Sequence, residues 1–157
     1  MATVSSLLIP AGYGWLAGMR SLSAPAAAGL WLRRNGRPRG GVARALTSPA
    51  ARWALPAMAV AELTGDKWSR TPDRTALLPF AARLAAGALT GAAVAQALYG
   101  RRAATRGAFI GAAAALVSTL VSFRLRRAAG RALGSPARAG LAEDALTLGL
   151  GALLARA

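Results

Sequence analysis

Carboxylates are the groups whose positions in this chain could do chemistry, because they are scarce. The 157 residues include five acids against twenty basic residues, which gives a net charge of +15. Glu62 and Asp66 stand four positions apart at the end of an apolar run, and Glu143 and Asp144 are neighbours within another. Carboxylates inside apolar segments mark ion pathways, proton relays or ion pairs. These four residues therefore form the candidate site.

Glu62 and Asp66 share one face if a single helix runs through both. Two ionised carboxylates at that spacing repel each other, so they need a shared proton, a bound cation or an arginine partner. The alternative is that the helix ends at Gly65 and that Asp66 is an ordinary loop residue. We favour this alternative for Asp66, and we predict a buried, paired carboxylate at Glu62.

Glu143 and Asp144 point about 100° apart on a helix, so they cannot share one site equally. A helix that begins at Pro136 would place them about 11–12 Å along its axis, too deep for short acidic side chains to reach a surface. Arg20 and Arg83 are their natural counter-ions, because guanidinium stays charged and offers a bidentate fork to carboxylate. The pair is predicted to lie on a functional pathway, and a purely structural ion pair is the alternative.

Other kinds of catalytic chemistry have no residues to support them. The sequence contains no cysteine and no histidine, which excludes disulfides, thiol nucleophiles, zinc–thiolate sites and imidazole bases. It also has no phosphate-binding glycine loop and no cluster of metal ligands. We therefore expect no enzyme activity, no metal site and no cofactor.

Long apolar stretches could supply membrane-spanning helices. Hydrophobic residues make up 55% of the chain, and its mean hydropathy is +0.39. Met1–Met19 and Gly107–Phe123 carry no charge, and Thr75–Gly100 carries only Arg83. A helix needs about 17–25 apolar residues to cross a bilayer. Arginines cluster between these stretches and aromatic residues mark their ends, which is typical of membrane proteins. A nucleic-acid-binding protein would instead gather its arginines on one face of a soluble fold.

Serine–proline and threonine–proline pairs predict three helix starts, because the hydroxyl caps free amides and proline is pre-set for the first turn. The pairs at Ser48, Thr71 and Ser135 give helices over 49–64, 72–99 and 136–155. Pro56 should kink the first of these helices. Apolar runs predict two more helices, over Leu7–Met19 and 105–126.

Two breaks separate the apolar segments near the N-terminus. Arg33–Gly41 is rich in glycine and arginine and is predicted to be a non-helical linker. Arg20–Pro25 interrupts two apolar pieces. This second break is either part of a discontinuous, buried segment or a simple interfacial turn with Arg20 reaching to head groups.

Glycines spaced four apart recur in three apolar runs and predict close helix–helix packing. Each half of the chain, 1–70 and 71–157, contains an apolar hairpin, a basic loop and a serine–proline helix with two acids, which suggests an inverted internal repeat. The packing glycines are Gly14, Gly18, Gly87, Gly91, Gly107 and Gly111.

Four segments resemble a family of small bacterial integral membrane proteins, the domain-of-unknown-function family 4126. The most specific is Ala61–Thr75, with an E-x-x-x-D-K element followed by R-T-P-x-R-T; the others are Gly18–Pro25, Gly87–Ala92 and Ala142–Gly151. Trp68 departs from the aliphatic residue that the family tends to carry there. The resemblance implies a compact multi-helix membrane fold and brings no established activity.

Residues 1–157 are thus expected to form one all-α domain, a polytopic membrane helix bundle of five or six segments, some short or discontinuous. We predict a multi-pass protein of the bacterial inner membrane that acts as a carrier or channel for a small ion or solute. The alternatives are a non-transporting membrane scaffold or assembly factor, and a peripheral nucleic-acid-binding protein. Expected partners are the bilayer with its anionic lipids, a small ion or solute, and further copies of the chain; the membrane interpretation includes no nucleic acid.

Overall fold

The chain is a bundle of α-helices, seen in a computed structural model that describes residues 5–35, 40–65, 77–132 and 134–156. Within these ranges there are seven helices and no β-strand, so the predicted all-α class is confirmed. The helices are α1 (Ser5–Met19), α2 (Ser23–Arg34), α3 (Gly41–Thr47), α4 (Pro49–Gly65), α5 (Leu77–Tyr99), α6 (Ala103–Ala132) and α7 (Pro136–Leu154).

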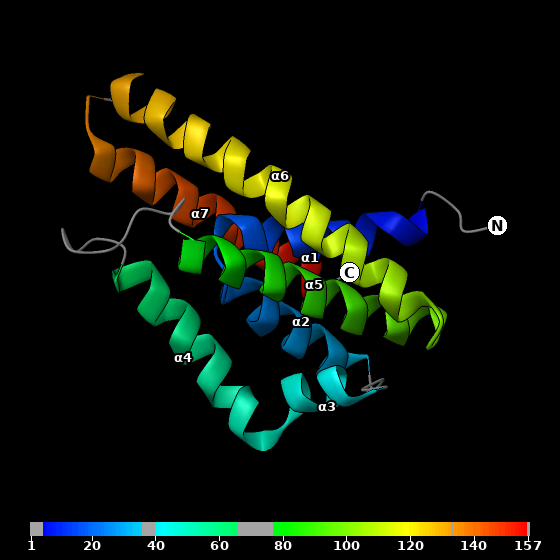
Figure 1. Ribbon diagram of the computed structural model, residues 1–157. Helices are drawn as coiled ribbons and strands as arrows, with labels where there is room; N and C mark the ends of the chain where they lie inside the picture. The colour runs from blue at the N-terminus through cyan, green and yellow to red at the C-terminus, as the bar shows by residue number, and fades with distance from the viewer. Residues whose placement is uncertain (1–4, 36–39, 66–76, 133, 157) are drawn as a thin grey trace.

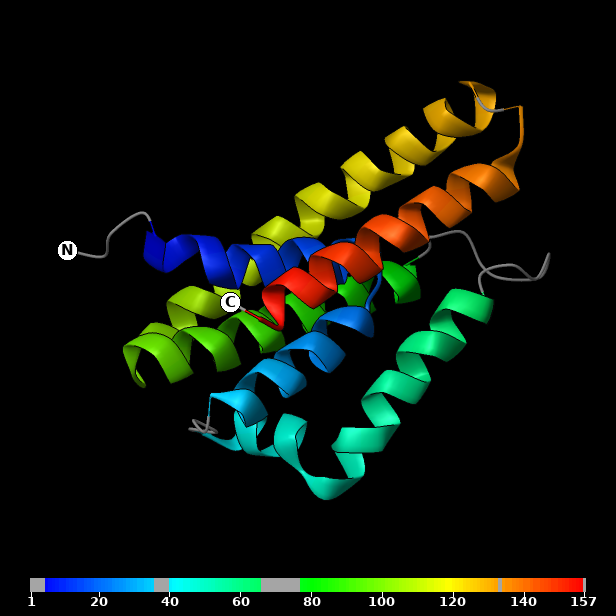
Figure 2. The ribbon, with the colours of Figure 1, turned by 180° about the vertical axis from the view of Figure 1, so that it is seen from behind.

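Three helices form the centre of the bundle. α5 packs along α6, and α1 lies against both of them (Figure 1). α7 runs back along α6 and also contacts α1 and α2. α4 packs mainly against α2 and α3 and lies at the edge of the molecule, as the view from behind shows (Figure 2).

Two of the predicted helix starts are confirmed. Ser48 Oγ accepts a hydrogen bond from the Ala51 amide at 3.2 Å, at the start of α4. Ser135 Oγ accepts one from the Arg138 amide at 3.4 Å, at the start of α7. Each hydroxyl satisfies an amide that has no partner inside its helix. The third predicted start, at Thr71, lies outside the described residues.

Other helix bounds differ from the sequence-based expectation. The predicted non-helical linker is wrong at Arg33 and Arg34, which form the last turn of α2, and at Gly41, which begins α3. Arginine has a good helix propensity, and its charge interacts favourably with a helix C-terminus. α3 was not predicted, and α6 extends to Ala132, beyond the predicted 105–126. α4 continues through Pro56 as one helix, and the kink there stays a prediction.

Glycine allows the backbones of the central helices to touch. A Cβ added at Gly14 of α1 or at Gly87 of α5 would overlap the carbonyl of Gly111 on α6. Gly91 and Gly107 face each other in the same way, one turn along the α5–α6 contact. The sixth predicted packing residue, Gly18, lies against Ala115 and Ser118. All six glycines therefore lie where α1, α5 and α6 approach most closely.

Hydroxyl groups connect α1 to α6 in this tight contact. Ser118 Oγ donates a hydrogen bond to the Trp15 carbonyl at 2.7 Å, and Thr119 Oγ1 donates one to the Gly18 carbonyl at 3.2 Å. Both side chains are buried. The packed face of α6 is thus made of glycine, alanine, serine and threonine, whereas large apolar residues such as Phe109 lie on its outer face.

By length and composition, α5 and α6 could each cross a membrane. α1 is also apolar, over Leu7–Met19, but it is shorter. These two helices are a weak indication of membrane association. The polytopic arrangement and the inverted repeat of 1–70 and 71–157 stay predictions.

Candidate functional site

The turn between α1 and α2 lies at the centre of the charged residues. α1 ends at Met19, α2 begins at Ser23, and the chain reverses direction between them (Figures 1 and 2). Arg20, the first residue of this turn, has only 1% of its surface exposed. The interpretation in which Arg20 reaches out to head groups is therefore wrong, because its guanidinium is held inside the bundle by the partners described next.

Glu62 of α4 binds this turn with its carboxylate. Its Oε1 accepts hydrogen bonds from the Ser21 amide at 2.9 Å and from Ser21 Oγ at 2.7 Å. Its Oε2 accepts one from the Leu22 amide at 2.8 Å. No side chain of α2 itself caps this end of the helix. A carboxylate is favoured there because the free amides and the helix dipole both attract negative charge. Glu62 was predicted to be buried and paired, whereas its carboxylate is half-buried and binds two amides and a hydroxyl.

Arg20 connects this turn to two other helices. Its Nη2 forms an ion pair with Asp144 Oδ1 of α7, and its Nη1 donates a hydrogen bond to the Glu62 carbonyl of α4 at 3.2 Å. The side chains of Arg20 and Asp144 are 2% and 13% exposed. The predicted role of Arg20 as a counter-ion of Asp144 is confirmed. This one guanidinium therefore holds α4 and α7 against the α1–α2 turn.

Glu143 has a different partner from its neighbour. Its Oε2 lies 3.3 Å from Arg126 Nη1 of α6, and the two side chains are 8% and 29% exposed. The separate partners agree with the prediction that the two adjacent acids cannot share one site equally, and of the two only Asp144 lines the cavity described below. Sequence reasoning missed Arg126, which it grouped with the other arginines of a basic loop. A signal was present, because Arg126 and Glu143 lie at nearly equal distances along the chain from Gly134, in the turn between antiparallel helices.

The remaining predicted site residues are Arg83 and Asp66. Arg83 is buried on α5, with 4% of its surface exposed. Asp66 lies outside the described residues, so both interpretations of it stay open. The pairing of Arg83 with one of the four acids stays a prediction. The charged centre seen in the structure thus consists of Arg20, Glu62 and Asp144, with the Arg126–Glu143 pair beside it.

A cavity of about 350 Å³ opens onto this centre between the α1–α2 turn, α6 and α7. Two guanidiniums and one carboxylate face it, and apolar residues complete its walls. In the described part of the chain no three His, Cys, Asp or Glu side chains come together to hold a metal ion. The charged groups could instead bind a small ion or a charged solute directly. The lining residues are Arg20, Arg126, Pro136, Ala137, Gly140, Leu141 and Asp144.

Comparison with known proteins found no family model, no curated protein and no solved structure that matches this chain. The resemblance to family 4126 stays a prediction. Function must therefore be argued from the surface, the charged centre and its cavity, since a helical bundle by itself is compatible with many activities.

Proposed function

We propose that this chain is a polytopic integral membrane protein of the bacterial inner membrane, because its burial pattern suits lipid better than water. Phe109, Leu146 and Leu153 are 74%, 67% and 68% exposed, while Arg20 and Arg83 are buried. Leaving a large apolar side chain in water forgoes about 1.5–3 kcal/mol of burial free energy. In a bilayer the same exposure has no such cost, and helices associate through small and polar residues. The glycine, serine and threonine contacts of α1, α5 and α6 follow that pattern.

The distribution of charge on the two longest helices supports the same proposal. Arg101 and Arg102 lie exposed at the turn between α5 and α6, and Arg124, Arg127 and Arg131 lie exposed near the other end of α6. Between these basic ends α6 is free of charge from Gly107 to Phe123. Basic residues that flank an apolar span interact well with lipid head groups. A peripheral nucleic-acid-binding protein would have no use for the exposed apolar surface between them.

Within the membrane, the protein would act as a carrier or channel for a small ion or solute. The observation that carries this proposal is the cavity faced by both members of the Arg20–Asp144 pair. A buried ion pair beside a cavity can exchange its internal partner for a ligand: the guanidinium can bind an anionic group, and the carboxylate a cationic one. Burying charged groups such as Arg20 and Asp144 costs free energy, and this cost favours a functional reason for their presence.

A non-transporting scaffold is the second candidate, and Glu62 favours it. Both carboxylate oxygens of Glu62 accept hydrogen bonds from the α1–α2 turn, and Glu62 does not line the cavity. It ties α4 to α2 as a structural element would. In this alternative the Arg20–Asp144 and Arg126–Glu143 pairs also serve only to hold helices together, and the cavity carries nothing.

Solute entry into proteoliposomes separates the two candidates. Vesicles containing the wild-type protein should swell faster than protein-free vesicles in at least one isosmotic solution of sodium chloride, sodium acetate or glycine. Glu143→Gln keeps the shape of the side chain but removes the negative charge that faces Arg126, which lines the cavity, so it should abolish the excess swelling. Arg138→Gln alters an exposed residue of the same helix and should leave swelling unchanged.

The protein must remain folded for this comparison, which its elution volume in detergent and its thermal midpoint would establish. Wild-type vesicles that swell no faster than empty ones in all three solutes would reject transport of these solutes and leave the scaffold. Full swelling with a folded Glu143→Gln variant would reject a role in transport for the Arg126–Glu143 pair beside the charged centre.

A further inference from the structure

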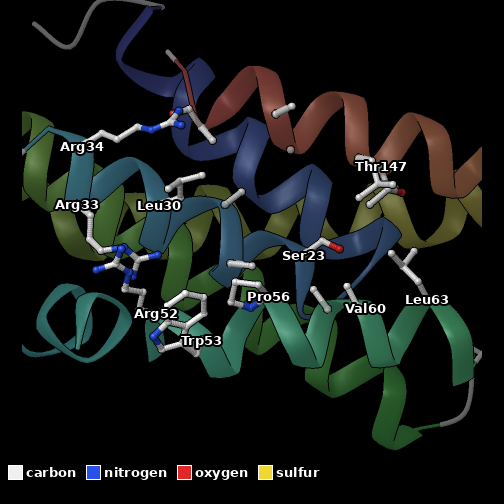
Figure 3. A pocket seen from close by; sticks show the side chains of 17 residues that line it. Ser23, Leu30, Arg33, Arg34, Arg52, Trp53, Pro56, Val60, Leu63 and Thr147 are labelled. Atoms are coloured by element: carbon white, nitrogen blue, oxygen red, sulfur yellow. The ribbon is translucent and has the colours of Figure 1, made fainter. Parts of the chain in front are cut away.

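A second and larger hollow lies between α2, α4 and α7 (Figure 3). Its volume is about 730 Å³, within the range of about 300–1,000 Å³ that is usual for ligand sites. Its walls are mostly apolar, with Leu30, Pro56, Val60 and Leu63 among them. It shares no lining residue with the cavity at Arg20. We refer to it as the α2–α4 groove.

Three arginines gather at one end of the α2–α4 groove. Arg33 and Arg34 end α2 and Arg52 lies in the first turn of α4, and Figure 3 shows the guanidiniums of Arg33 and Arg52 side by side. No carboxylate from the described ranges pairs with any of the three. Their contacts are with neutral groups: Arg33 donates to the Leu46 carbonyl and Arg34 to the Ala155 carbonyl, each at 3.2 Å. This end of the groove is therefore positively charged, and the described residues supply no carboxylate as its counter-ion.

The closeness of two of these charges is itself unfavourable. Burial lowers the pKa of the Arg33 guanidinium, and the positive charge of Arg52 lowers it further. Both effects disfavour the charged form. Arginine nevertheless stays protonated in proteins, so the repulsion persists until an anion lies between the two groups. A phosphate there would accept hydrogen bonds from both guanidiniums.

The apolar part of the groove has the length of one lipid chain. From Arg52 to Leu63 the lining residues of α4 span about 16 Å, taking the helical rise per residue. Arg34 to Ser23 on α2 span the same distance in the opposite chain direction. One leaflet is half of a hydrocarbon core of about 30 Å. An acyl chain that begins at the arginines would therefore reach the far end of the groove.

We propose that the α2–α4 groove binds an anionic phospholipid, with the head-group phosphate between Arg33 and Arg52 and one acyl chain lying along α4. The charge at one end and the apolar length behind it match the two parts of such a molecule. This proposal rests on one part of the proposed function, which is that the protein lies in a membrane; it does not depend on transport. Its test measures lipid binding, so it can fail while transport succeeds, or the reverse.

The binding of phosphatidylglycerol to delipidated protein in detergent tests this proposal. Phosphatidylcholine with identical acyl chains should bind more weakly, because its head group has no net charge. Arg33→Gln and Arg52→Gln should each weaken phosphatidylglycerol binding about fivefold, the change expected for one basic residue at an anionic lipid. Arg138→Gln removes an exposed charge in the first turn of α7 that does not line the groove, and it should leave the affinity unchanged.

A second variant tests the acyl-chain position independently of charge. Ala59 is half-buried and lines the groove, so Ala59→Phe should obstruct the chain and abolish binding while the arginines remain. Equal affinity for the two lipids would refute the proposal. Competition by inorganic phosphate that is as strong as competition by the lipid would also refute it, because it would indicate a free-phosphate site. A lipid-free dimer that Ala59→Phe disrupts would refute it too, because it would indicate an interface between copies of the chain.

Discussion

Replacing Asp144 with asparagine should destabilise the bundle because it leaves the Arg20 guanidinium charged and buried. The Arg20 side chain is 2% exposed and that of Asp144 is 13% exposed, so water compensates little of the lost charge. Arginine cannot respond by losing its proton. Removing one partner of a buried ion pair costs about 3–5 kcal/mol. The asparagine oxygen can still accept a hydrogen bond, but it carries no charge.

The remaining contacts of Arg20 place the expected loss at the lower end of that range. Its Nη1 keeps the hydrogen bond to the Glu62 carbonyl at 3.2 Å, which solvates part of the charge. We therefore expect about 3 kcal/mol. For a domain of this size one kcal/mol corresponds to about 2–4 °C in Tm, so Asp144→Asn should lower Tm by about 6–12 °C.

Thermal unfolding in detergent, followed by tryptophan fluorescence, measures this loss. The double variant Arg20→Met/Asp144→Leu should recover most of it, since replacing a whole buried ion pair by apolar residues is often neutral or stabilising. Glu143→Gln is the matched comparison, because its partner Arg126 is 29% exposed and water can stabilise the released charge. It should lower Tm less than Asp144→Asn does.

Two results would refute this reasoning. One is an Asp144→Asn variant whose Tm falls no further than that of Glu143→Gln. The other is a double variant that is less stable than Asp144→Asn alone. Either result would mean that the lost charge attraction between Asp144 and Arg20 is not the source of the destabilisation.

Two pairs of substitutions test the contacts of Glu62 and the close packing of the helices. Glu62→Gln should cost about 1.5–3 kcal/mol, because an amide NH₂ replaces one acceptor of the charge-assisted hydrogen bonds, and Ser21→Ala should cost only about 1 kcal/mol; equal losses in thermal unfolding would contradict this order. Gly111→Ala would place a Cβ against the Gly87 carbonyl and should cost about 1–3 kcal/mol. Gly149→Ala has nothing within 4 Å of the added carbon and should be neutral or stabilising, so a tolerated Gly111→Ala would contradict the close α5–α6 contact.

Local features of the chain were sufficient to predict where two helices begin. The caps at Ser48 and Ser135 depend on three or four consecutive residues, so their chemistry is contained in the sequence. The end of α2 was harder to predict, because arginine is compatible with both a helix terminus and a charged linker. Helix bounds of this kind are decided by packing, which a single segment does not reveal.

The partners of the acids were predictable only in part. Arg20 could be named because it is an isolated charge between apolar pieces. Arg126 lies among other arginines, and composition assigned all of them to the surface. Helical geometry separates them: Arg126 is half-buried, while Arg124 and Arg127 are exposed. If 105–155 is treated as one antiparallel helical hairpin with its turn at Gly134, Arg126 lies opposite Glu143. The partner of Glu143 could therefore have been predicted from the sequence in this way.

The partners of Glu62 could not be predicted from the sequence. Its main partners are backbone amides of a helix start forty residues earlier, and every residue except proline has such an amide. No residue type at the other end could therefore identify the contact. The consequence concerns function: a carboxylate that binds amides of its own chain is occupied, whereas Asp144 faces a cavity together with its counter-ion. α7 is thus the helix on which a loss of transport should appear, and α4 the helix on which a substitution at Glu62 should reduce stability.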